Sequence, residues 1–293
     1  MTTPQRTPTP QEQARLDSIR RNWQQRRAIT ENLSLIKRKV AVYSGKGGVG
    51  KTTVSVNLAI ALTKSGNRVG IIDADVYGPN VPMMLGISSQ LESDGKKIVP
   101  AEKYGIRVVS MGFLADEKAP LIWRGPMLHG VVRQFLQDVR WGELDYLVVD
   151  MPPGTGDVAL SLSQTVPVSG AVVVTTPQKV SLADSRRAVA MYEKLNIPTL
   201  GIIENMSYYV CPGCAQEADL FGKGGGVQIA EELNVPFLGQ IPLCTPIRVG
   251  GDTGAPIVSV EPDSPGGQAF SQAAERTVDQ LSIASKKPLA PVL

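Results

Sequence analysis

Apolar and polar positions along the chain follow two patterns: short runs rich in β-branched residues, and longer stretches with apolar residues three or four positions apart. The short runs are typical of buried strands, and the longer stretches are typical of helices that pack on them. The runs that predict strands begin at Val40 and then cover 67–73, 106–110, 144–150, 170–175 and 199–204. The stretches that predict helices are 11–36, 54–62, 126–139, 182–195 and 266–283. This order predicts an α/β protein with a mostly parallel β-sheet covered by helices on both faces.

The junction between the first strand and the helix at 54–62 carries a glycine-rich phosphate-loop motif. Gly45 to Thr52 fits the pattern G-x-x-x-x-G-K-[ST], which is typical of loops whose backbone amides bind nucleotide phosphates. The glycines let the backbone curl around an anion, and the following helix offers unpaired N–H groups and its positive end. Lys51 is expected to reach the β- and γ-phosphates, and the Thr52 hydroxyl to bind Mg²⁺. The predicted nucleotide-binding residues here are Gly45, Lys46, Gly47, Gly48, Val49, Gly50, Lys51, Thr52 and Thr53.

Carboxylates follow two of the predicted strands, at the edge where open parallel sheets bind their ligands. Asp73 and Asp75 lie at the end of the strand at 67–73, where they form either a plain polar turn or part of the nucleotide site. Asp150 ends the strand at 144–150, as a Walker B carboxylate that reaches Mg²⁺ or its bound water does. The Pro/Gly-rich segment 151–157 could sense the γ-phosphate and move as a switch, and Asp157 is expected to cap the next helix.

Three cysteines in a chain of 293 residues do not make a disulfide framework, but Cys211 and Cys214 form a C-x-x-C pair on a Pro/Gly turn. Two thiolates do not complete a four-thiolate metal site. Two more from a symmetric partner would make a Cys₄ site for a 4Fe–4S cluster or for structural Zn²⁺. A thioredoxin-like redox pair is disfavoured because the motif follows a late strand. Cys244 is expected to be a buried free cysteine, and His129 to have a surface or packing role.

Composition indicates the size and the surroundings of the protein. With 42% hydrophobic residues, the chain can bury the core of one main domain at 39–283, which includes a metal loop at 205–226. A basic arm with a Thr/Pro-rich, disordered start is predicted at 1–38, and a tail at 284–293. The net charge of +3 and the lack of a long apolar run favour a cytoplasmic protein that binds neither nucleic acid nor membranes. The arm's helix is expected to pack on its own domain or on a partner subunit through a loose apolar stripe of Leu16, Ile19, Trp23, Ile29 and Leu33.

Together these motifs resemble the Mrp/ApbC family of iron–sulfur cluster carrier ATPases, within the MinD/ParA-like (SIMIBI) superfamily of deviant P-loop NTPases. The resemblance covers roughly Lys39 to Ala274. It rests on GKGGVGKTT at Gly45, DADVYGPN at Asp73, WRGPM at Trp123, LDYLVVDMPPGTGD at Leu144, ENMSYYVCPGC at Glu204 and FGKGGG at Phe221. The phosphate loop places the chain only in the superfamily, whereas PPGTGD combined with the C-x-x-C loop is specific to the family.

The resemblance implies a homodimer that binds MgATP, hydrolyses it slowly and transfers a bridging 4Fe–4S cluster to apo iron–sulfur proteins, in the company of cluster-assembly proteins. It implies that Lys46 reaches nucleotide in the partner subunit, that Asp75 orients the attacking water, and that Asn205 hydrogen-bonds the adenine ring. Asp73 is then a strand-end group near the metal. The resulting roles are catalysis by Lys51, Asp75 and Lys46, Mg²⁺ binding by Thr52 and Asp150, and cluster binding by Cys211 and Cys214.

Three alternatives remain open from the sequence. A ParA/MinD-type positioning ATPase would share the phosphate loop and both of its lysines, but it leaves the cysteine pair without a role. A dimeric ATPase with structural zinc would use the same two cysteines. An electron donor similar to the nitrogenase iron protein would also hold a bridging cluster, although its cysteines come from two separate loops.

Overall fold

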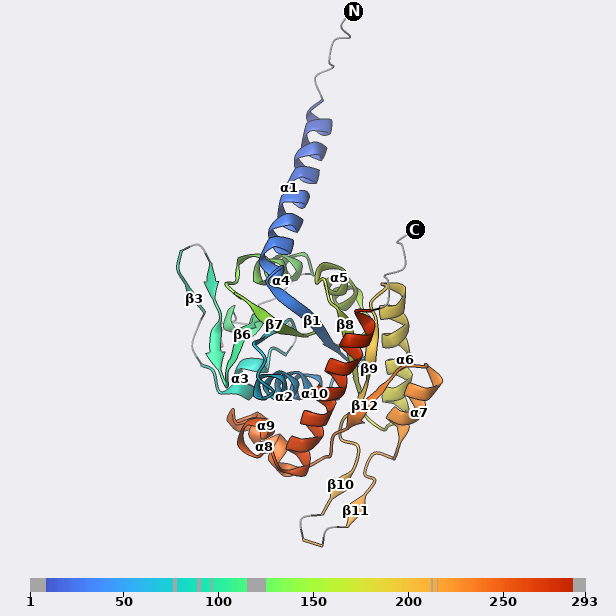
Figure 1. Cartoon of the computed structure of the whole chain (residues 1–293). Coiled ribbons are helices and arrows are strands. Elements are labelled where there is room, and N and C mark those ends of the chain that lie inside the picture. The colour runs from blue at the N-terminus through green and yellow to red at the C-terminus, as the bar shows by residue number, and fades with distance from the viewer. Residues whose placement is uncertain are drawn as a thin grey trace, which may run out of the picture.

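The computed structural model describes residues 9–75, 78–88, 91–95, 97–114, 125–211, 213–214 and 216–286. Its centre is an eight-stranded sheet in the order β12-β9-β8-β1-β7-β2-β6-β5 (Figure 1). These strands are β1 (Ile36–Tyr43), β2 (Val69–Asp73), β5 (Ala101–Lys103), β6 (Ile106–Ser110), β7 (Leu144–Asp150), β8 (Gly170–Thr175), β9 (Thr199–Glu204) and β12 (Phe237–Gln240). Neighbours are parallel except β5, which pairs antiparallel with β6. The predicted mostly parallel α/β sheet is confirmed.

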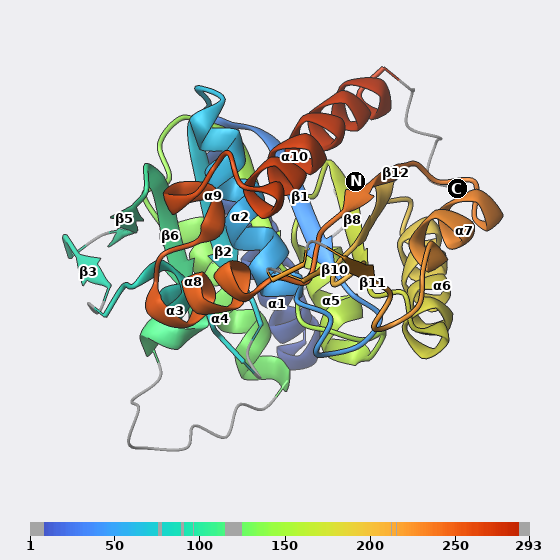
Figure 2. The same ribbon diagram turned by 90° about the horizontal axis from the view of Figure 1, so that it is seen from below.

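Helices cover both faces of this sheet (Figure 2). One face carries α2 (Lys51–Lys64), α3 (Val81–Leu85), α9 (Ile257–Val260) and α10 (Pro265–Ala284), with α8 (Thr245–Thr253) beside α3. The other face carries α4 (Gly125–Asp138), α5 (Asp157–Thr165), α6 (Lys179–Lys194) and α7 (Gly225–Glu232). Strand β1 contributes Val40 and Val42 to the first core and Ala41 and Tyr43 to the second. Successive strand residues point to opposite faces, so a strand buried on both sides is apolar throughout.

The hydrophobic pattern predicts the long, buried elements well. Strands β6, β7, β8 and β9 have the predicted bounds, and the predicted helices within the domain differ from the observed ones by only a few residues at each end. The pattern does not predict the short elements, because too few residues repeat to show a period. These are β3 (Glu92–Ser93), β4 (Ile98–Val99), β5, β10 (Tyr209–Val210), β11 (Glu217–Ala218), β12, α3, α7, α8 and α9.

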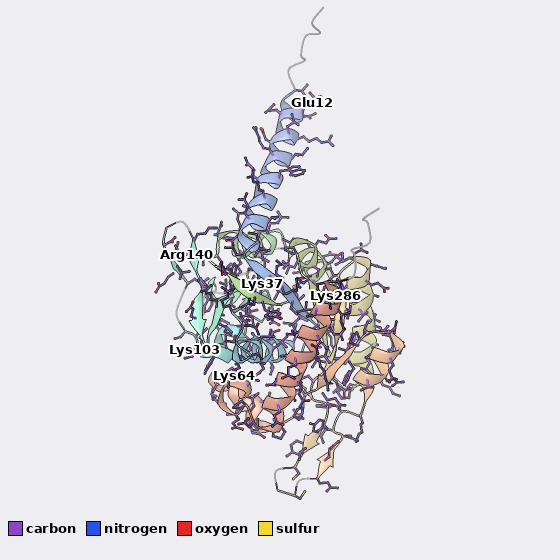
Figure 3. All side chains as sticks on the ribbon, viewed as in Figure 1. Glu12, Lys37, Lys64, Lys103, Arg140 and Lys286 are labelled. Atoms are coloured by element: carbon purple, nitrogen blue, oxygen red, sulfur yellow. The ribbon has the colours of Figure 1, made fainter. Side chains whose placement is uncertain are left out.

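The arm that precedes the sheet is a helix, α1 (Pro10–Leu33), which projects from the body of the protein (Figure 1). Its start is fixed by a capping box between Thr9 and Glu12, and Glu12 lies far from the sheet at the outer end (Figure 3). The helix ends at Leu33 rather than at the predicted residue 36, because Ile36 already begins β1.

Packing of α1 on its own domain is limited to its last turns. Of the predicted apolar stripe, only Ile29 and Leu33 are buried, and Trp23 is 73% exposed. Asn32 Nδ2 donates hydrogen bonds to the carbonyls of Leu136 on α4 and of Val139 just after it, both at 2.9 Å. Leu16, Ile19 and Trp23 are exposed, so on its own domain the predicted stripe packs only through Ile29 and Leu33, and its packing on a partner subunit stays a prediction.

Some predictions concern residues outside the described ranges. They include residues 1–8 of the disorder expected at 1–10, most of the tail at 284–293, Trp123 of the WRGPM motif, and the side chain of His129. The expected disorder is wrong for Thr9 and Pro10, which cap and begin α1. Within the described ranges, none of the helices combines the length and the apolar character needed to cross a membrane.

A carboxylate at the amino ends of the central strands ties three segments together. Asp145 on β7 accepts hydrogen bonds from Lys37 Nζ on β1 at 2.8 Å, from the Arg68 backbone N–H at 2.9 Å, and from Arg68 Nε at 3.3 Å. The hydrogen bond from Lys37 and those from Arg68 hold the pKa of Asp145 well below its usual range. Asp145 therefore stabilises the fold above its unfolded-state pKa of about 4, and this stabilisation is lost as the pH falls below that value.

We expect Asp145→Asn to lower the free energy of unfolding at pH 7 by about 1 kcal/mol, because Lys37 and Arg68 are largely exposed and their charges are screened. The difference from the unmodified protein should shrink towards pH 3, where the carboxylate is protonated in the unfolded chain. Urea unfolding at both pH values measures this. An equal difference at the two values would contradict the assignment.

Candidate functional site

The phosphate loop and the predicted carboxylates meet at the carboxyl edge of the sheet. The loop joins β1 to α2, and Asp73 and Asp150 end the strands β2 and β7. In the sheet, β7 lies between β1 and β2, and Asp73 is paired with Asp150. Because parallel strands end at the same edge, side chains that are distant in the sequence converge there.

The phosphate loop is tightly packed on one side and open on the other. Gly50 has a φ of +79°, and a Cβ at this position would lie 2.1 Å from Asn205 Nδ2. A Cβ at Gly45 would lie 2.3 Å from the backbone oxygen of Asp184. In contrast, a Cβ at Gly47 or Gly48 would meet no atom within 4 Å. The loop thus presents an open glycine backbone beside the N-terminus of α2, which fits a phosphate group.

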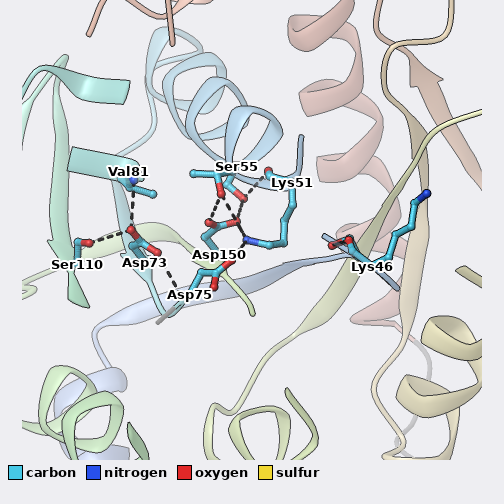
Figure 4. Close-up of polar contacts among 10 residues, drawn as sticks. Lys46, Lys51, Ser55, Asp73, Asp75, Val81, Ser110 and Asp150 are labelled. Carbon is cyan, nitrogen blue, oxygen red and sulfur yellow. Dashed lines mark hydrogen bonds and ion pairs between the residues drawn. The ribbon is translucent and has the colours of Figure 1, made fainter. Parts of the chain in front are cut away.

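Lys51 lies at the centre of a buried ion cluster (Figure 4). Its Nζ is 2.9 Å from Asp150 Oδ1 and 3.3 Å from Asp75 Oδ2, and the residue is only 6% exposed. Burial alone would lower the pKa of Lys51, but attraction by Asp150 and Asp75 outweighs it and raises the pKa. The lysine is therefore a stable cation that an incoming phosphate could attract away from the two carboxylates.

Two hydroxyls of α2 complete the surroundings of Asp150. Thr52 Oγ1 donates to Asp150 Oδ2 at 2.8 Å, and Ser55 Oγ donates to Asp150 Oδ1 at 2.6 Å. Carboxylate and hydroxyl oxygens are ligands that Mg²⁺ prefers, so Thr52 and Asp150 form a donor set that fits this ion. Sequence reasoning did not single out Ser55. Its spacing of four residues from Lys51 could have indicated it, because this spacing places both side chains on one face of the helix.

Asp73 is a buried residue that holds the backbone of the site in place. It is fully buried, and its Oδ2 accepts hydrogen bonds from Ser110 Oγ at 2.8 Å and from the Val81 N–H at 3.2 Å. Its Oδ1 accepts a hydrogen bond from the Asp75 N–H at 3.2 Å. Burial and the neighbouring Asp150 carboxylate raise the pKa of Asp73 to about 8. Through the hydrogen bond from the Asp75 N–H, the Asp73 side chain fixes the backbone of Asp75, whose carboxylate contacts Lys51.

Other predicted nucleotide-site residues lie around this cluster. Asn205 follows β9, and its Nδ2 donates to the Val49 carbonyl of the phosphate loop at 2.9 Å. Lys46 is half-buried, and its side chain points away from Lys51 and Asp75 (Figure 4). Thr53 lies in the first turn of α2, where its carbonyl accepts a hydrogen bond from Asn57 Nδ2.

Asp157 does not cap α5 as expected. It is the first residue of that helix, Gly156 occupies the N-cap position, and no side chain caps the helix. The Asp157 carboxylate is exposed in the first turn, where it can still interact favourably with the helix dipole.

Cys211 and Cys214 lie at the tip of a hairpin that projects from the body (Figure 1). Strands β10 and β11 form its antiparallel stem, and the Cys211 N–H donates to the Gln216 carbonyl at 3.0 Å. Cys214 is exposed and Cys211 is half-buried. Backbone amides of Cys214 and Gly213, together with the Cys214 thiol, lower the pKa of Cys211, which favours the thiolate that binds metals.

The cysteine pair has no further metal ligand grouped with it in the part of the chain that the structure describes. Among the described residues, no group of three or more His, Cys, Asp or Glu side chains could hold a metal ion. Cys244 is free and half-buried, rather than fully buried as expected, and burial raises the pKa of its thiol.

Comparisons with known proteins agree with this combination of a phosphate loop and a cysteine pair. The model of a ParA family, described as NUBPL iron-transfer P-loop NTPase, matches residues 35–278. The iron–sulfur cluster carrier protein of Synechocystis sp. is 51% identical over 87% of this chain and 74% of its own length. The iron–sulfur cluster carrier protein of Methanocaldococcus jannaschii is 49% identical over 88% of this chain and 90% of its own length.

Solved structures show the same architecture. A nucleotide-binding protein from Archaeoglobus fulgidus, in complex with ADP, aligns with a TM-score of 0.73 and 38% identity over 84% of this chain and 96% of its own. The cell division ATPase MinD from Pyrococcus furiosus aligns with a TM-score of 0.64 and 26% identity over 83% of this chain and 98% of its own. The chain therefore belongs to the ParA-type family of NUBPL iron-transfer P-loop NTPases.

Proposed function

We propose that this protein is an ATP-dependent carrier of 4Fe–4S clusters that receives a cluster from cluster-assembly proteins and delivers it to apo iron–sulfur proteins. The observation that carries the proposal is the C-x-x-C pair on an exposed hairpin whose stem begins beside the phosphate loop. Cys214 is open to solvent, as transfer requires, and Asn205, a few residues before the hairpin stem, contacts Val49 of the loop. The names of the curated relatives support the same cargo.

The cluster would bridge two copies of the chain. Each copy offers two thiolates, and a 4Fe–4S cluster usually takes four. A symmetric dimer supplies them when the hairpins meet at its axis. Apolar side chains that a partner could cover lie close to the cysteines in sequence: Val210 and Leu220 are 42% and 58% exposed. In such a dimer, Lys46 would reach the nucleotide bound in the partner subunit.

The residues around Lys51 suggest how ATP would be bound and hydrolysed. A γ-phosphate in the loop would compete with Asp75 and Asp150 for the Lys51 ammonium group. The Asp75 carboxylate, still anchored through its backbone on Asp73, could then orient the attacking water. Thr52 and Asp150 would hold Mg²⁺, which would neutralise negative charge on the phosphates. We propose that hydrolysis is slow and gates cluster transfer in the cytoplasm.

Transfer of the cluster between proteins tests this proposal. Cluster-loaded protein is mixed under anaerobic conditions with an apo 4Fe–4S enzyme, and recovery of the enzyme's activity is followed with and without MgATP. We expect recovery that depends on the loaded protein and that changes rate several-fold with nucleotide, the size typical of coupling between two sites. Recovery no faster than with free iron and sulfide would overturn the carrier function.

A further inference from the structure

Glu204 is a buried carboxylate that neither the phosphate loop nor the cysteine pair explains. It is the last residue of β9 and is fully buried. Its Oε1 accepts hydrogen bonds from Ser207 Oγ at 2.5 Å and from Gln240 Nε2 at 3.1 Å. Its Oε2 accepts a hydrogen bond from the backbone N–H of Gly226. All three contacts are donors, so the site is built for an ionised carboxylate.

The placement of this charge is costly. Across the described part of the chain, Glu204 forms no ion pair, and a buried carboxylate without a cation loses much of its hydration energy. The N-terminal end of α7 offsets part of this cost, because Gly226 is the second residue of that helix and Gly224 is its N-cap. A neutral side chain would fill the space at lower cost, but it could not accept three hydrogen bonds.

The glycines of the FGKGGG motif make this contact possible. A Cβ at Gly226 would lie 2.7 Å from the Glu204 Cβ and 3.0 Å from Oε2. A Cβ at Gly225 would lie 2.7 Å from a Leu182 methyl carbon and 2.9 Å from the Pro177 carbonyl oxygen. Glycine at position 226 therefore allows the start of α7 to approach the end of β9 closely, and glycine at position 225 allows it to approach Pro177 and Leu182.

The three donors lie on both sides of the cysteine hairpin. Ser207 precedes the hairpin, and Gly226 follows it, so both cysteines lie between the two contacts. Gln240 ends β12, the edge strand beside β9. One carboxylate thus joins to the sheet both the segment that leads into the hairpin and the helix α7 that follows it.

The residue next to Glu204 contacts the nucleotide site. The Asn205 N–H donates to the Thr175 carbonyl at 2.8 Å, while its side chain donates to the Val49 carbonyl. Met206 then turns the chain with a φ of +53°, a conformation that is strained for a side chain other than glycine. The Ser207 N–H donates to the Ile241 carbonyl at 2.9 Å. Residues 204–207 therefore connect the phosphate loop to the segment that leads into the hairpin.

We infer that Glu204 is a positioning residue that couples the nucleotide site to the cysteine hairpin. A shift of the phosphate loop moves Asn205 through the Val49 carbonyl, and Glu204 passes the shift to both ends of the hairpin. The inference rests on the proposed function for the role of the cysteines as cargo ligands. The coupling itself does not require that the cargo be an iron–sulfur cluster.

The test measures how nucleotide changes the reactivity of the cysteines in full-length, metal-free protein. The background variant Cys244→Ser removes the third thiol. Iodoacetamide alkylation of Cys211 and Cys214 is followed by mass spectrometry with and without a magnesium complex of a non-hydrolysable ATP analogue. We expect nucleotide to change the alkylation rate by about 5-fold or more. In Glu204→Gln the ratio of the two rates should fall close to one, while the affinity for the nucleotide is retained.

A matched control lies on the hairpin itself. Glu217 on β11 is exposed and pairs only with the exposed Lys223 in the described structure, at 3.4 Å. The same change of acid to amide, Glu217→Gln, should leave the nucleotide response at the level of the background protein. Loss of the response in Glu204→Gln but not in Glu217→Gln supports the coupling. An unchanged response in folded Glu204→Gln overturns it, as does a background protein without any response.

A second variant decides the matter if Glu204→Gln does not fold. Ser207→Ala removes one donor and leaves the contacts from Gly226 and Gln240 in place. We expect a reduced response in a protein that still unfolds cooperatively, and a full response would overturn the inference. Cluster binding is measured separately, so a nucleotide-sensitive hairpin that binds no cluster would refute the proposed cargo while leaving the coupling intact.

Discussion

Replacing Lys51 with alanine is expected to abolish ATP turnover and to destabilise the protein. The ammonium group is the cation that a bound γ-phosphate would meet, and removing one preorganised charge of this kind typically costs about 100-fold or more in turnover. The same change removes the Lys51 ammonium group from its contacts with the buried carboxylates of Asp150 and Asp75. Breaking a buried ion pair in this way costs about 3 kcal/mol or more. Phosphate release and urea unfolding measure the two effects.

Two other lysine variants separate these effects. Lys51→Arg keeps a positive charge near the carboxylates, so it should restore much of the stability but little of the turnover, because the planar guanidinium differs in shape. Lys46→Ala should leave stability unchanged, since its side chain points away from the ion cluster (Figure 4). In the proposed dimer, Lys46→Ala should nevertheless lose turnover. Normal ATP hydrolysis by Lys51→Ala would contradict the assignment of the phosphate site.

Replacing both Cys211 and Cys214 with serine is expected to eliminate cluster binding while leaving nucleotide binding intact. Each chain offers only these two thiols on the hairpin, and serine is a poor ligand for iron in such clusters. The hairpin projects from the body, so the change should not disturb the core (Figure 1). Iron and sulfide content after anaerobic reconstitution, together with nucleotide titration, measures the two properties.

A control for the cysteine variant is Cys244→Ser. Cys244 lies at the N-cap of α8 rather than on the hairpin, so its replacement should leave the iron content unchanged. Loss of iron in Cys244→Ser equal to that in the double variant would show that the hairpin pair alone does not bind the cluster.

The sequence predicts those parts of the protein that repeat a pattern or match a motif. Strands β7 and β8 each contain a run of buried apolar residues that ends at a polar residue, Asp150 and Thr175, so their positions follow from the sequence. The short edge strand β5 pairs antiparallel with β6, and its three residues are too few to show the alternation of apolar and polar positions that predicts a strand. The exposure of Trp23 was also unpredictable, because a helix's apolar stripe does not show what covers it.

In the candidate site, too, some residues follow from a sequence motif and others only from the three-dimensional structure. Motif spacing identified Lys51 and Asp150, because their chemistry depends on local order along the chain. The contact of Asn205 with the Val49 carbonyl joins residues that are distant in the sequence, and only the sheet brings them together. The need for glycine at position 226 follows from the close packing of Glu204 against it, which the sequence does not show. Ser55 belongs to no motif, so its contribution to the site is known only from its hydrogen bond to Asp150.

Native mass spectrometry of the reconstituted protein under anaerobic conditions tests most directly whether a cluster bridges two copies of the chain. We expect a dimer that carries one 4Fe–4S cluster, about four irons and four sulfides for two chains. We expect the Cys211→Ser/Cys214→Ser variant to carry no cluster. Zinc in place of the cluster, a complete cluster on a single chain, or the same iron content in the variant would contradict this expectation.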